Sequence, residues 1–192
     1  MVMWGGEDWT KARRVTKARM LLAPAVRGAS GVWADLGCGD GVFSYLLGEA
    51  LAPGSQLYAV DKAPGVLRQL TRNLAGRCRN ITLHPTQADF TQPLALPPLD
   101  GIVLANALHF VEIKTPVLEQ LALLLKPGAC LVVIEYNTNQ GNYAVPYPLD
   151  ATVFLSLAAT VGLHNAKIVA LAPSSFLGEM YTGVAFAAHG CR

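Results

Sequence analysis

Short apolar runs alternate along this chain with stretches whose apolar residues recur at helical spacing. The apolar runs have the length and composition of buried strands, and they occupy residues 32–36, 56–61, 81–84, 99–110 and 130–137. The stretches between them place apolar side chains on one side only, which predicts helices over residues 9–22, 42–51, 64–74, 115–125 and 150–162. This alternation of strands and helices predicts an α/β domain built on a mainly parallel sheet.

Prolines and glycines set the expected boundaries of these elements. Pro64 and Pro116 can each open a helix, where the missing N–H of proline costs nothing, and Thr115 is expected to cap the second of these helices. Lys126-Pro127-Gly128 should end that helix, and Pro85 should stop the third strand. The segments Lys167–Leu171 and Met180–Ala187 are expected to be the last two strands.

The length and composition indicate one domain. The chain has 192 residues, of which 52% are hydrophobic and 15% charged, which is enough for one sizeable core and too little for two. We therefore expect a single domain over residues 1–192, with an N-terminal helix within 1–22 and the core within 30–190. No apolar run reaches the roughly 18 residues of a membrane span, and there is no basic-then-apolar secretory pattern, so we expect a cytoplasmic protein.

Cysteine spacing and charge restrict the expected partners. Cysteines 38, 78, 130 and 191 have no metal-ligand spacing, so we expect reduced thiols and no metal. The net charge is only +2, although basic residues gather within 11–19 and 62–79. No aromatic residues interleave these charges to offer stacking surfaces for bases, so solvated faces are the simpler interpretation and nucleic acid is not the expected partner.

The stretch Asp35-Leu-Gly-Cys-Gly-Asp-Gly41 carries the clearest functional signal. Three glycines follow a buried strand and precede a helix, so a ligand can approach the backbone closely, and an anionic group can meet the helix N-terminus. A nicotinamide-dependent oxidoreductase would use a similar turn, but its fingerprint is GxGxxG, whereas this chain has GxGxG. Asp35 is badly placed for a pyrophosphate and well placed for an ammonium group.

A second acidic residue, Asp61, is placed to bind the ribose of a nucleoside. Asp61 ends the second predicted strand, 24 residues after Gly37, and a carboxylate at this point can bind both hydroxyls of a ribose. Lys62 follows it directly. Its side chain can lie along an adenine ring, although an exposed loop lysine is an equal alternative.

The pattern DLGCGDG resembles motif I of the class I S-adenosylmethionine-dependent methyltransferases, and the order of the later segments continues the resemblance from about Trp33 to Ala188. The resemblance implies a doubly wound, seven-stranded, mostly parallel sheet with a C-terminal antiparallel hairpin and helices on both faces. It also implies S-adenosylmethionine as cofactor, bound in part by Gly37, Gly39 and Gly41. Asp89 would then accept from the adenine amine, the backbone near Phe90 would meet the ring, and Asn106 would line the methyl-transfer site.

Methyl transfer mainly requires that the acceptor be held in line with the sulfonium, and an oxygen or nitrogen acceptor can also require a base. His109, Glu135 and Tyr136 are candidates for that base by position alone. The irregular stretch from Asn137 to Leu149 leaves the carboxyl edge of the predicted sheet, and we expect its amide and aromatic side chains to bind a small-molecule acceptor, through Asn137, Tyr143 and Tyr147.

Two questions stay open at this level. The cofactor residues would look the same in an S-adenosylmethionine-binding subunit that has no catalytic activity, so that alternative is kept beside the enzyme. The segment Met1–Leu22 is expected to be either a mobile lid over the site or a static helix packed on the sheet.

Overall fold

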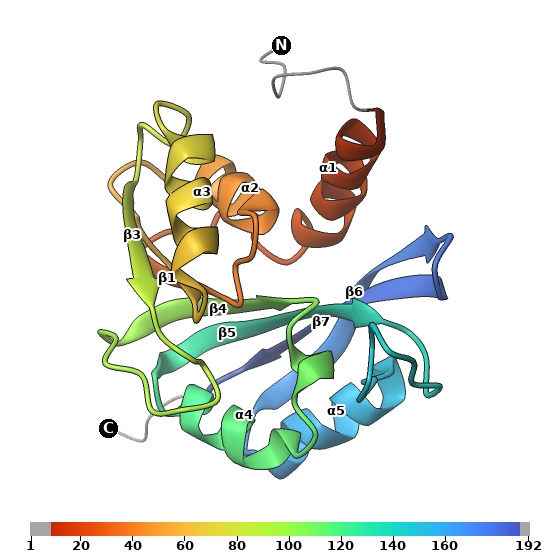
Figure 1. The fold of residues 1–192 in the computed structure, drawn as a ribbon. Helices are drawn as coiled ribbons and strands as arrows, with labels where there is room; N and C mark the ends of the chain where they lie inside the picture. The colour runs from red at the N-terminus through yellow and green to blue at the C-terminus, as the bar shows by residue number, and fades with distance from the viewer. Residues whose placement is uncertain (1–8, 189–192) are drawn as a thin grey trace.

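The computed structural model describes residues 9–188, which form a three-layered α/β domain (Figure 1). Its central sheet has seven strands in the order β3-β2-β1-β4-β5-β7-β6. The strand bounds are β1 Val32–Leu36, β2 Gln56–Asp61, β3 Thr82–Gln87, β4 Leu99–Ala105, β5 Leu125–Tyr136, β6 His164–Ser174 and β7 Gly178–Phe186. The first five strands are parallel, and β7 runs antiparallel to both β5 and β6. The predicted fold class and C-terminal hairpin are confirmed.

Helices cover both faces of the sheet (Figure 1). One face carries α1 Trp9–Leu22, α2 Val42–Ala50 and α3 Pro64–Leu74, and the other carries α4 Lys114–Ala122 and α5 Ala151–Thr160. Each strand contributes side chains to both helical layers, because successive side chains point to opposite faces of the sheet. Trp33 of β1 packs in the same core cluster as Leu22 and Leu47, whereas Ala34 and Leu36 pack in the cluster that contains Leu118. A short 3-10 helix, η1 Leu108–Phe110, follows β4.

Four predicted boundaries are wrong. Strand β3 continues through Pro85, which pairs with Ala59, because β3 is an edge strand whose outer side needs no N–H donor. Helix α4 begins at Lys114 rather than after a Thr115 cap, and Pro116 is tolerated at its third position, where a helical N–H still has no partner within the helix.

The segment Lys126-Pro127-Gly128 does not end that helix but belongs to β5. Helix α4 already stops at Ala122, and residues 125–128 run beside β4 with an irregularity between Leu99 and Gly101. An ion pair between Lys126 Nζ and Asp100 Oδ2, at 2.7 Å, ties the segment to that neighbouring strand. The predicted strand Leu99–Phe110 correspondingly ends at Ala105 and gives way to η1.

The order of the strands creates a crevice at one edge of the sheet. The chain leaves β1 in one direction and β4 in the other, so the loops that follow these two strands separate at their carboxyl ends, where α/β sheets bind ligands. No helix among residues 9–188 is long and apolar enough to cross a membrane.

Candidate functional site

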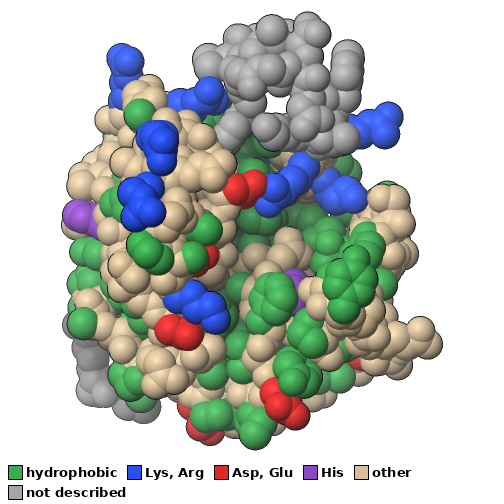
Figure 2. All heavy atoms as spheres, viewed as in Figure 1, with side chains coloured by type: hydrophobic (Ala, Val, Ile, Leu, Met, Phe, Trp, Pro, Cys, Tyr) green, Lys and Arg blue, Asp and Glu red, His purple; other side chains and the backbone are tan. Residues whose placement is uncertain are grey.

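A cavity of about 780 Å³ lies at the carboxyl ends of four adjacent strands. Its walls come from the segments that follow β1, β2, β3 and β4, and its lining residues are Gly37, Gly39, Asp61, Lys62, Ala88, Asp89, Phe90, Thr91, Asn106, Ala107, Phe110 and Val111. The fold therefore brings together seven of the predicted cofactor residues, although they span 70 positions of the sequence. Figure 2 shows a hollow on this face of the molecule, with hydrophobic side chains gathered around it.

The glycine-rich turn forms one wall of this cavity. The N–H groups of Gly37 and Cys38 both donate to the carbonyl of Val60, at 2.8 and 3.0 Å, which holds the turn against the end of β2. Gly37 and Gly39 both have a positive φ, of 73° and 53°. A Cβ at Gly37 would lie 2.9 Å from the Cβ of Ala107, whereas a Cβ at Gly39 would meet nothing closer than 4.0 Å. The backbone at Gly39 is therefore open to a ligand.

Gly41 has a different local role from the other two glycines. It is the N-cap residue of α2 with a φ of 86°, and a Cβ there would lie 3.0 Å from Cγ of Leu70. The structure does not bring Gly41 into the lining of the cavity. Its left-handed conformation and its close packing against α3 are sufficient reasons for a glycine at this position.

Asp61 is engaged with the backbone on both sides of its carboxylate. Oδ2 accepts from the N–H of Gly39 at 3.1 Å, and Oδ1 accepts from the N–H of Ala63 at 2.9 Å. A carboxylate has about four acceptor positions, so these two bonds leave capacity for two hydroxyl donors. Asp61 therefore braces the glycine turn and faces the cavity at the same time.

Asp89 and Phe90 form the wall that follows β3. Oδ1 of Asp89 accepts from both the N–H and the hydroxyl of Thr91, and these hydrogen bonds, aided by the charge of Lys62, lower the pKa of the Asp89 carboxyl. The carbonyl of Phe90 is held by the side chain of Gln120 at 2.8 Å. Thr91 is a site residue that the sequence analysis missed, although an Asp followed two positions later by Thr is a known turn signal.

Asn106, at the end of β4, has an unusual backbone conformation. Its φ is 53°, in the left-handed region that Asn tolerates better than most residues, and its N–H donates to the carbonyl of Ile134 at 2.8 Å. Its Oδ1 is the one buried side-chain polar atom in the described part of the chain that has no hydrogen-bond partner. A buried carbonyl oxygen without a donor is costly, so this atom at the cavity wall is suited to accept from a bound ligand.

Asp35 does not line the cavity but lies beneath the glycine turn. It is 1% exposed, and its Oδ2 accepts from the hydroxyl of Ser44 at 2.6 Å. Burial raises the pKa of Asp35 to about 7, and the hydrogen bond from Ser44 partly opposes this effect. Sequence spacing gave no indication of Ser44, because the contact joins β1 to the first turn of α2.

His109 and Glu135 form a buried pair beside the cavity. Nδ1 of His109 lies 2.7 Å from Oε2 of Glu135, and the two side chains are only 4% and 1% exposed. Oε1 of Glu135 accepts from the N–H groups of Leu108 and His109, so η1 and β5 are joined by three hydrogen bonds. The carbonyl of His109 accepts from the N–H of Tyr147 at 3.0 Å, which fixes the histidine from the side of the 137–149 loop.

The other ring nitrogen of His109, Nε2, has no hydrogen-bond partner among the described residues. It is also absent from the buried unpaired atoms of that part of the chain, so it keeps access to the surface. A carboxylate at Nδ1 favours the tautomer that carries its proton there, which leaves Nε2 free to accept one. The pair therefore has the arrangement of a general base and the group that orients it.

The remaining acceptor-site candidates lie in different surroundings. Tyr136 is half-buried, and burial, with the charge of Glu135, raises the pKa of its hydroxyl. Asn137 has both ends of its amide engaged, by Glu179 at 2.7 Å and by the N–H of Ala151 at 3.1 Å. Tyr143 is 94% exposed, and the carbonyl of Tyr147 accepts from Lys114 Nζ. The structure brings Tyr147 close to His109. The residues that line the cavity include none of the predicted catalytic and acceptor residues His109, Glu135, Tyr136, Asn137, Tyr143 and Tyr147.

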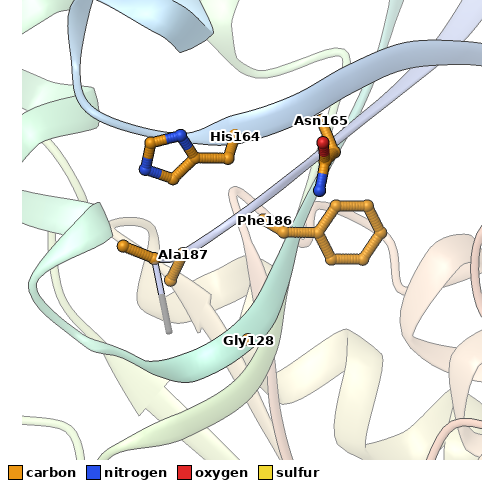
Figure 3. Close-up of a pocket in the computed structure, with 6 residues that line it drawn as sticks. Gly128, His164, Asn165, Phe186 and Ala187 are labelled. Atoms are coloured by element: carbon orange, nitrogen blue, oxygen red, sulfur yellow. The ribbon is translucent and has the colours of Figure 1, made fainter. Parts of the chain in front are cut away.

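A second cavity, of about 490 Å³, lies at the opposite edge of the sheet, where β5 and β6 begin and β7 ends (Figure 3). His164 and Asn165 lie on one side of it and Phe186 and Ala187 on the other. Among the residues that the structure describes, no carboxylate, lysine or arginine lines it. Within residues 9–188, no group of three or more His, Cys, Asp or Glu side chains is placed to hold a metal ion.

The family model described as "Methyltransferase domain" matches residues 34–131, which contain the glycine turn, Asp61, Asp89 and Asn106. The chain belongs to this methyltransferase family. S-adenosylmethionine is accordingly its cofactor, as predicted, and the family match decides against the nicotinamide-dependent alternative. A comparison with curated proteins finds no match to the sequence.

Solved structures, methyltransferases among them, share the fold of this chain. The N-methyltransferase NodS from Bradyrhizobium japonicum WM9 superposes with a TM-score of 0.70 at 17% identity, over 95% of this chain and 99% of that one. A SAM-dependent methyltransferase from Aquifex aeolicus gives 0.69 at 15% identity, over 95% and 100%. A possible exported protein from Bordetella parapertussis gives 0.70 at 16% identity, over 93% and 68%. At these identities the likeness extends to the fold alone.

Proposed function

We propose that this methyltransferase transfers a methyl group to a small-molecule acceptor whose attacking atom gives up a proton to His109. The observation that carries this proposal is the 2.7 Å contact between His109 and Glu135, in a pair that is buried, fixed by backbone hydrogen bonds and adjacent to the cofactor cavity. Such fixation matters because a catalytic base acts efficiently only when its orientation is set before the reaction.

The residues around the cavity fit the cofactor. The open backbone at Gly39 suits close approach, the spare acceptor capacity of Asp61 suits the ribose hydroxyls, and the unpaired Oδ1 of Asn106 suits the ammonium group. Asp89, Phe90 and Lys62 would surround the adenine. Gly37 and Gly41 would shape the turn, with Asp35 buried beneath it. When bound, S-adenosylmethionine supplies a methyl group already activated by its sulfonium.

In this proposal the residues next to the acceptor have different roles. His109 accepts the proton at Nε2, Glu135 holds the ring in the tautomer that can do so, and Tyr136 borders the acceptor. Tyr147 positions His109 through its backbone. Tyr143 and Asn137 stay predictions as acceptor contacts, and the amide of Asn137 would first have to leave its present partners.

We propose further that residues 1–192 act as one domain in the cytoplasm and that the acceptor is not a nucleic acid. The free thiols of Cys38, Cys78 and Cys130 are consistent with a reducing compartment. Two arginines of the basic first helix are engaged within the chain, Arg14 by Asp40 and Arg19 by Glu49, which reduces the positive charge available to phosphates.

Calorimetry and a transfer assay test this function. The intact chain is titrated with S-adenosylmethionine, S-adenosylhomocysteine and NAD, and transfer of labelled methyl is then measured to 2-naphthol, 2-naphthylamine and 2-decalol. We expect binding of the two sulfur compounds, no binding of NAD and methylation of at least one acceptor. Failure of both sulfur compounds to bind overturns the proposal. Tight binding with no transfer to any acceptor favours the non-catalytic binding subunit instead.

Two variants isolate the base. His109→Ala should lower kcat by at least about 100-fold while S-adenosylhomocysteine affinity is kept, and added imidazole should restore part of the activity. Glu135→Gln keeps an oxygen for the two backbone N–H groups but presents an amide to Nδ1, so it should lower kcat in the same way by selecting the wrong tautomer. His164→Ala, in the opposite cavity, is the matched control. Full activity in folded His109→Ala excludes this histidine as the base.

A further inference from the structure

Four rings form a continuous row from the cofactor cavity to the turn between β6 and β7. Phe110, which lines the cavity, lies with its ring centroid 4.3 Å from that of His109. The His109 centroid is 6.3 Å from that of Tyr136, and Tyr136 meets Phe176 edge-on at 5.7 Å. We call these four residues the aromatic row. Its residues come from η1, β5 and the β6–β7 turn, which are far apart in the sequence. The spacing of aromatic residues along the chain therefore does not predict the row.

The two ends of the aromatic row are exposed although they are among the most hydrophobic side chains. Phe110 is 62% and Phe176 47% exposed, while His109 between them is almost fully buried. The N–H of Phe176 donates to Oγ of Ser174 at 3.3 Å, a hydrogen bond that joins the turn to the end of β6. Two exposed aromatic rings therefore flank the proposed catalytic base. Such an arrangement indicates a surface that can bind a flat apolar molecule.

We infer that the acceptor is a flat aromatic compound with a hydroxyl group, whose ring lies along the aromatic row and whose hydroxyl reaches Nε2 of His109. This inference rests on the proposed function and names the substrate class of the same site. In the reaction, the hydroxyl oxygen forms a bond to the methyl carbon as the bond from that carbon to sulfur breaks. The sulfur keeps the electron pair, S-adenosylhomocysteine leaves, and the hydroxyl proton passes to Nε2.

Acidity selects an aromatic hydroxyl over an aliphatic one. A phenolic hydroxyl has a pKa near 10, far below that of water at about 15.7, so an imidazole base can draw its proton much more readily than that of an ordinary alcohol. Aromatic partners also gain from edge-to-face and offset contacts with rings, which a saturated ring of the same outline does not make.

Charges of both signs lie near the aromatic row. The guanidinium of Arg14 acts to lower the pKa of the Tyr136 hydroxyl, but burial and the charge of Glu135 both act more strongly to raise it. Lys114 Nζ is held by the carbonyls of Val111 and Tyr147, next to the loop that fixes His109. The carboxylate that touches the row, Glu135, is buried and already bonded to His109. The preference for a hydroxyl therefore rests on its acidity and on the proton acceptor at His109, and not on the charge around the row.

The test compares three probes of similar outline on the intact chain saturated with S-adenosylhomocysteine. They are 2-naphthol, its saturated counterpart 2-decalol, and 2-naphthylamine, with binding followed by saturation-transfer NMR. Transfer is followed with labelled S-adenosylmethionine. We expect 2-naphthol to bind and to be methylated, 2-decalol to bind at least about fivefold more weakly, and 2-naphthylamine to be methylated more slowly.

Variants then locate the binding surface. Phe176→Ala and Phe176→Leu should each raise the KM for 2-naphthol about fivefold with little change in kcat, because the ring contributes to binding and not to proton transfer. Leu171→Ala removes another exposed apolar side chain, 56% exposed on β6 outside the aromatic row, and should change neither. The leucine variant retains apolar bulk, so its effect separates the aromatic ring from simple hydrophobic contact.

The outcomes distinguish this inference from the proposed function. If S-adenosylhomocysteine fails to bind, both are overturned. If it binds but 2-naphthol does not, if 2-decalol binds equally well, or if 2-naphthylamine is methylated faster, the aromatic hydroxyl class is overturned. Methyl transfer through this site then stands when at least one of the other two probes is methylated, and is overturned with the substrate class when none is. An unchanged KM in both Phe176 variants removes the aromatic row as the binding surface.

Discussion

A hydrogen bond joins Asp61 to Gly39 in the wall of the cofactor cavity: Oδ2 of the acid accepts from the backbone N–H of the glycine at 3.1 Å. The two residues belong to different signals in the sequence, the acid that ends β2 and the turn that follows β1. Since Oδ1 of Asp61 is bonded to Ala63, the same carboxylate fixes the glycine turn and the start of α3. A change at Asp61 therefore affects the shape of the cavity as well as a proposed ligand contact.

Asp61→Ala should weaken binding of S-adenosylhomocysteine by about 1.5–3 kcal/mol, the scale of losing charge-assisted hydrogen bonds to two hydroxyls. Calorimetry measures the loss, and circular dichroism should show a folded chain. Asp61→Asn keeps one acceptor oxygen for Gly39 and should lie between the parent and the alanine variant. Parental affinity in a folded Asp61→Ala protein would mean that this carboxylate does not bind the ribose.

Gly39→Val should abolish cofactor binding, because branched carbons would enter the space that the open backbone leaves for a ligand. The positive φ of 53° adds a conformational cost of its own, so a control with the same kind of strain is needed. Gly54→Val provides it: Gly54 has a φ of 83°, its Cβ would meet nothing within 4 Å, and it lies outside the cavity. If both variants lose stability but only Gly39→Val loses binding, the close approach is established; retained affinity in folded Gly39→Val refutes it.

Asp35 should make the stability of the protein depend on pH between about 4 and 7. Burial raises its pKa from 3.8 to about 7, so the folded chain binds this proton more tightly than the unfolded chain does. The contribution favours folding below about pH 4, diminishes as pH rises, and is lost above about pH 7. The difference corresponds to about 4 kcal/mol in the free energy of unfolding.

Denaturant unfolding of Asp35→Asn at pH 4, 5.5 and 7 checks this contribution, and the fall in stability over that range should be smaller than in the parent. Ser44→Ala should act in the opposite direction. It removes the hydrogen bond that stabilises the charged carboxylate, so the fall should become steeper. The same pH dependence in Asp35→Asn as in the parent would show that Asp35 does not titrate in this range.

The sequence was sufficient to predict the sheet and much of the cofactor cavity because these depend on local and ordered features. A buried run followed by glycines gives β1 and its turn, and an acid that ends the next run gives Asp61. The parallel order of the strands then brings their carboxyl ends together, whatever the distance along the chain. Boundaries at Pro85 and Lys126 failed because they depend on neighbours, namely the edge position of β3 and the ion pair to Asp100.

Contacts between distant elements could not be predicted in the same way. The order of the segments placed His109 and Glu135 near the same sheet edge, but not at hydrogen-bonding distance, since that needs η1 to turn back onto β5. Ser44 beneath Asp35 and Phe176 beside Tyr136 have no local signal at all. The amide of Asn137 also makes contacts that the sequence did not indicate, because it joins Glu179 to the start of α5, while its role as an acceptor contact stays a prediction.

The first helix connects directly to the glycine-rich turn. Nη1 and Nη2 of Arg14 lie 2.5 and 3.0 Å from the two carboxylate oxygens of Asp40, and Arg19 is paired with Glu49 of α2. Ala18, Leu21 and Leu22 are buried, so the second half of α1 is packed on the domain. A lid, one of the two alternatives for residues 1–22, can therefore involve only the first half of the helix and the residues before it. Those preceding residues, Met1–Asp8, lie outside the described part of the chain.

This division predicts different effects for the two arginines. Arg14→Ala releases the turn that lines the cofactor cavity, so S-adenosylhomocysteine affinity should fall several-fold, within the roughly 1 kcal/mol that an exposed ion pair contributes. Arg19→Ala removes a comparable ion pair, which joins α1 only to α2, and it should leave the affinity for S-adenosylhomocysteine unchanged.

Deletion of Met1–Trp9 should also weaken binding of S-adenosylhomocysteine several-fold if this segment is a lid. In the intact chain, hydrogen exchange of residues 11–17 should then slow when S-adenosylhomocysteine binds, whereas residues 18–22 should be protected in both states. Unchanged affinity in Arg14→Ala and in the deletion, with unchanged exchange, would mean that α1 is a static helix.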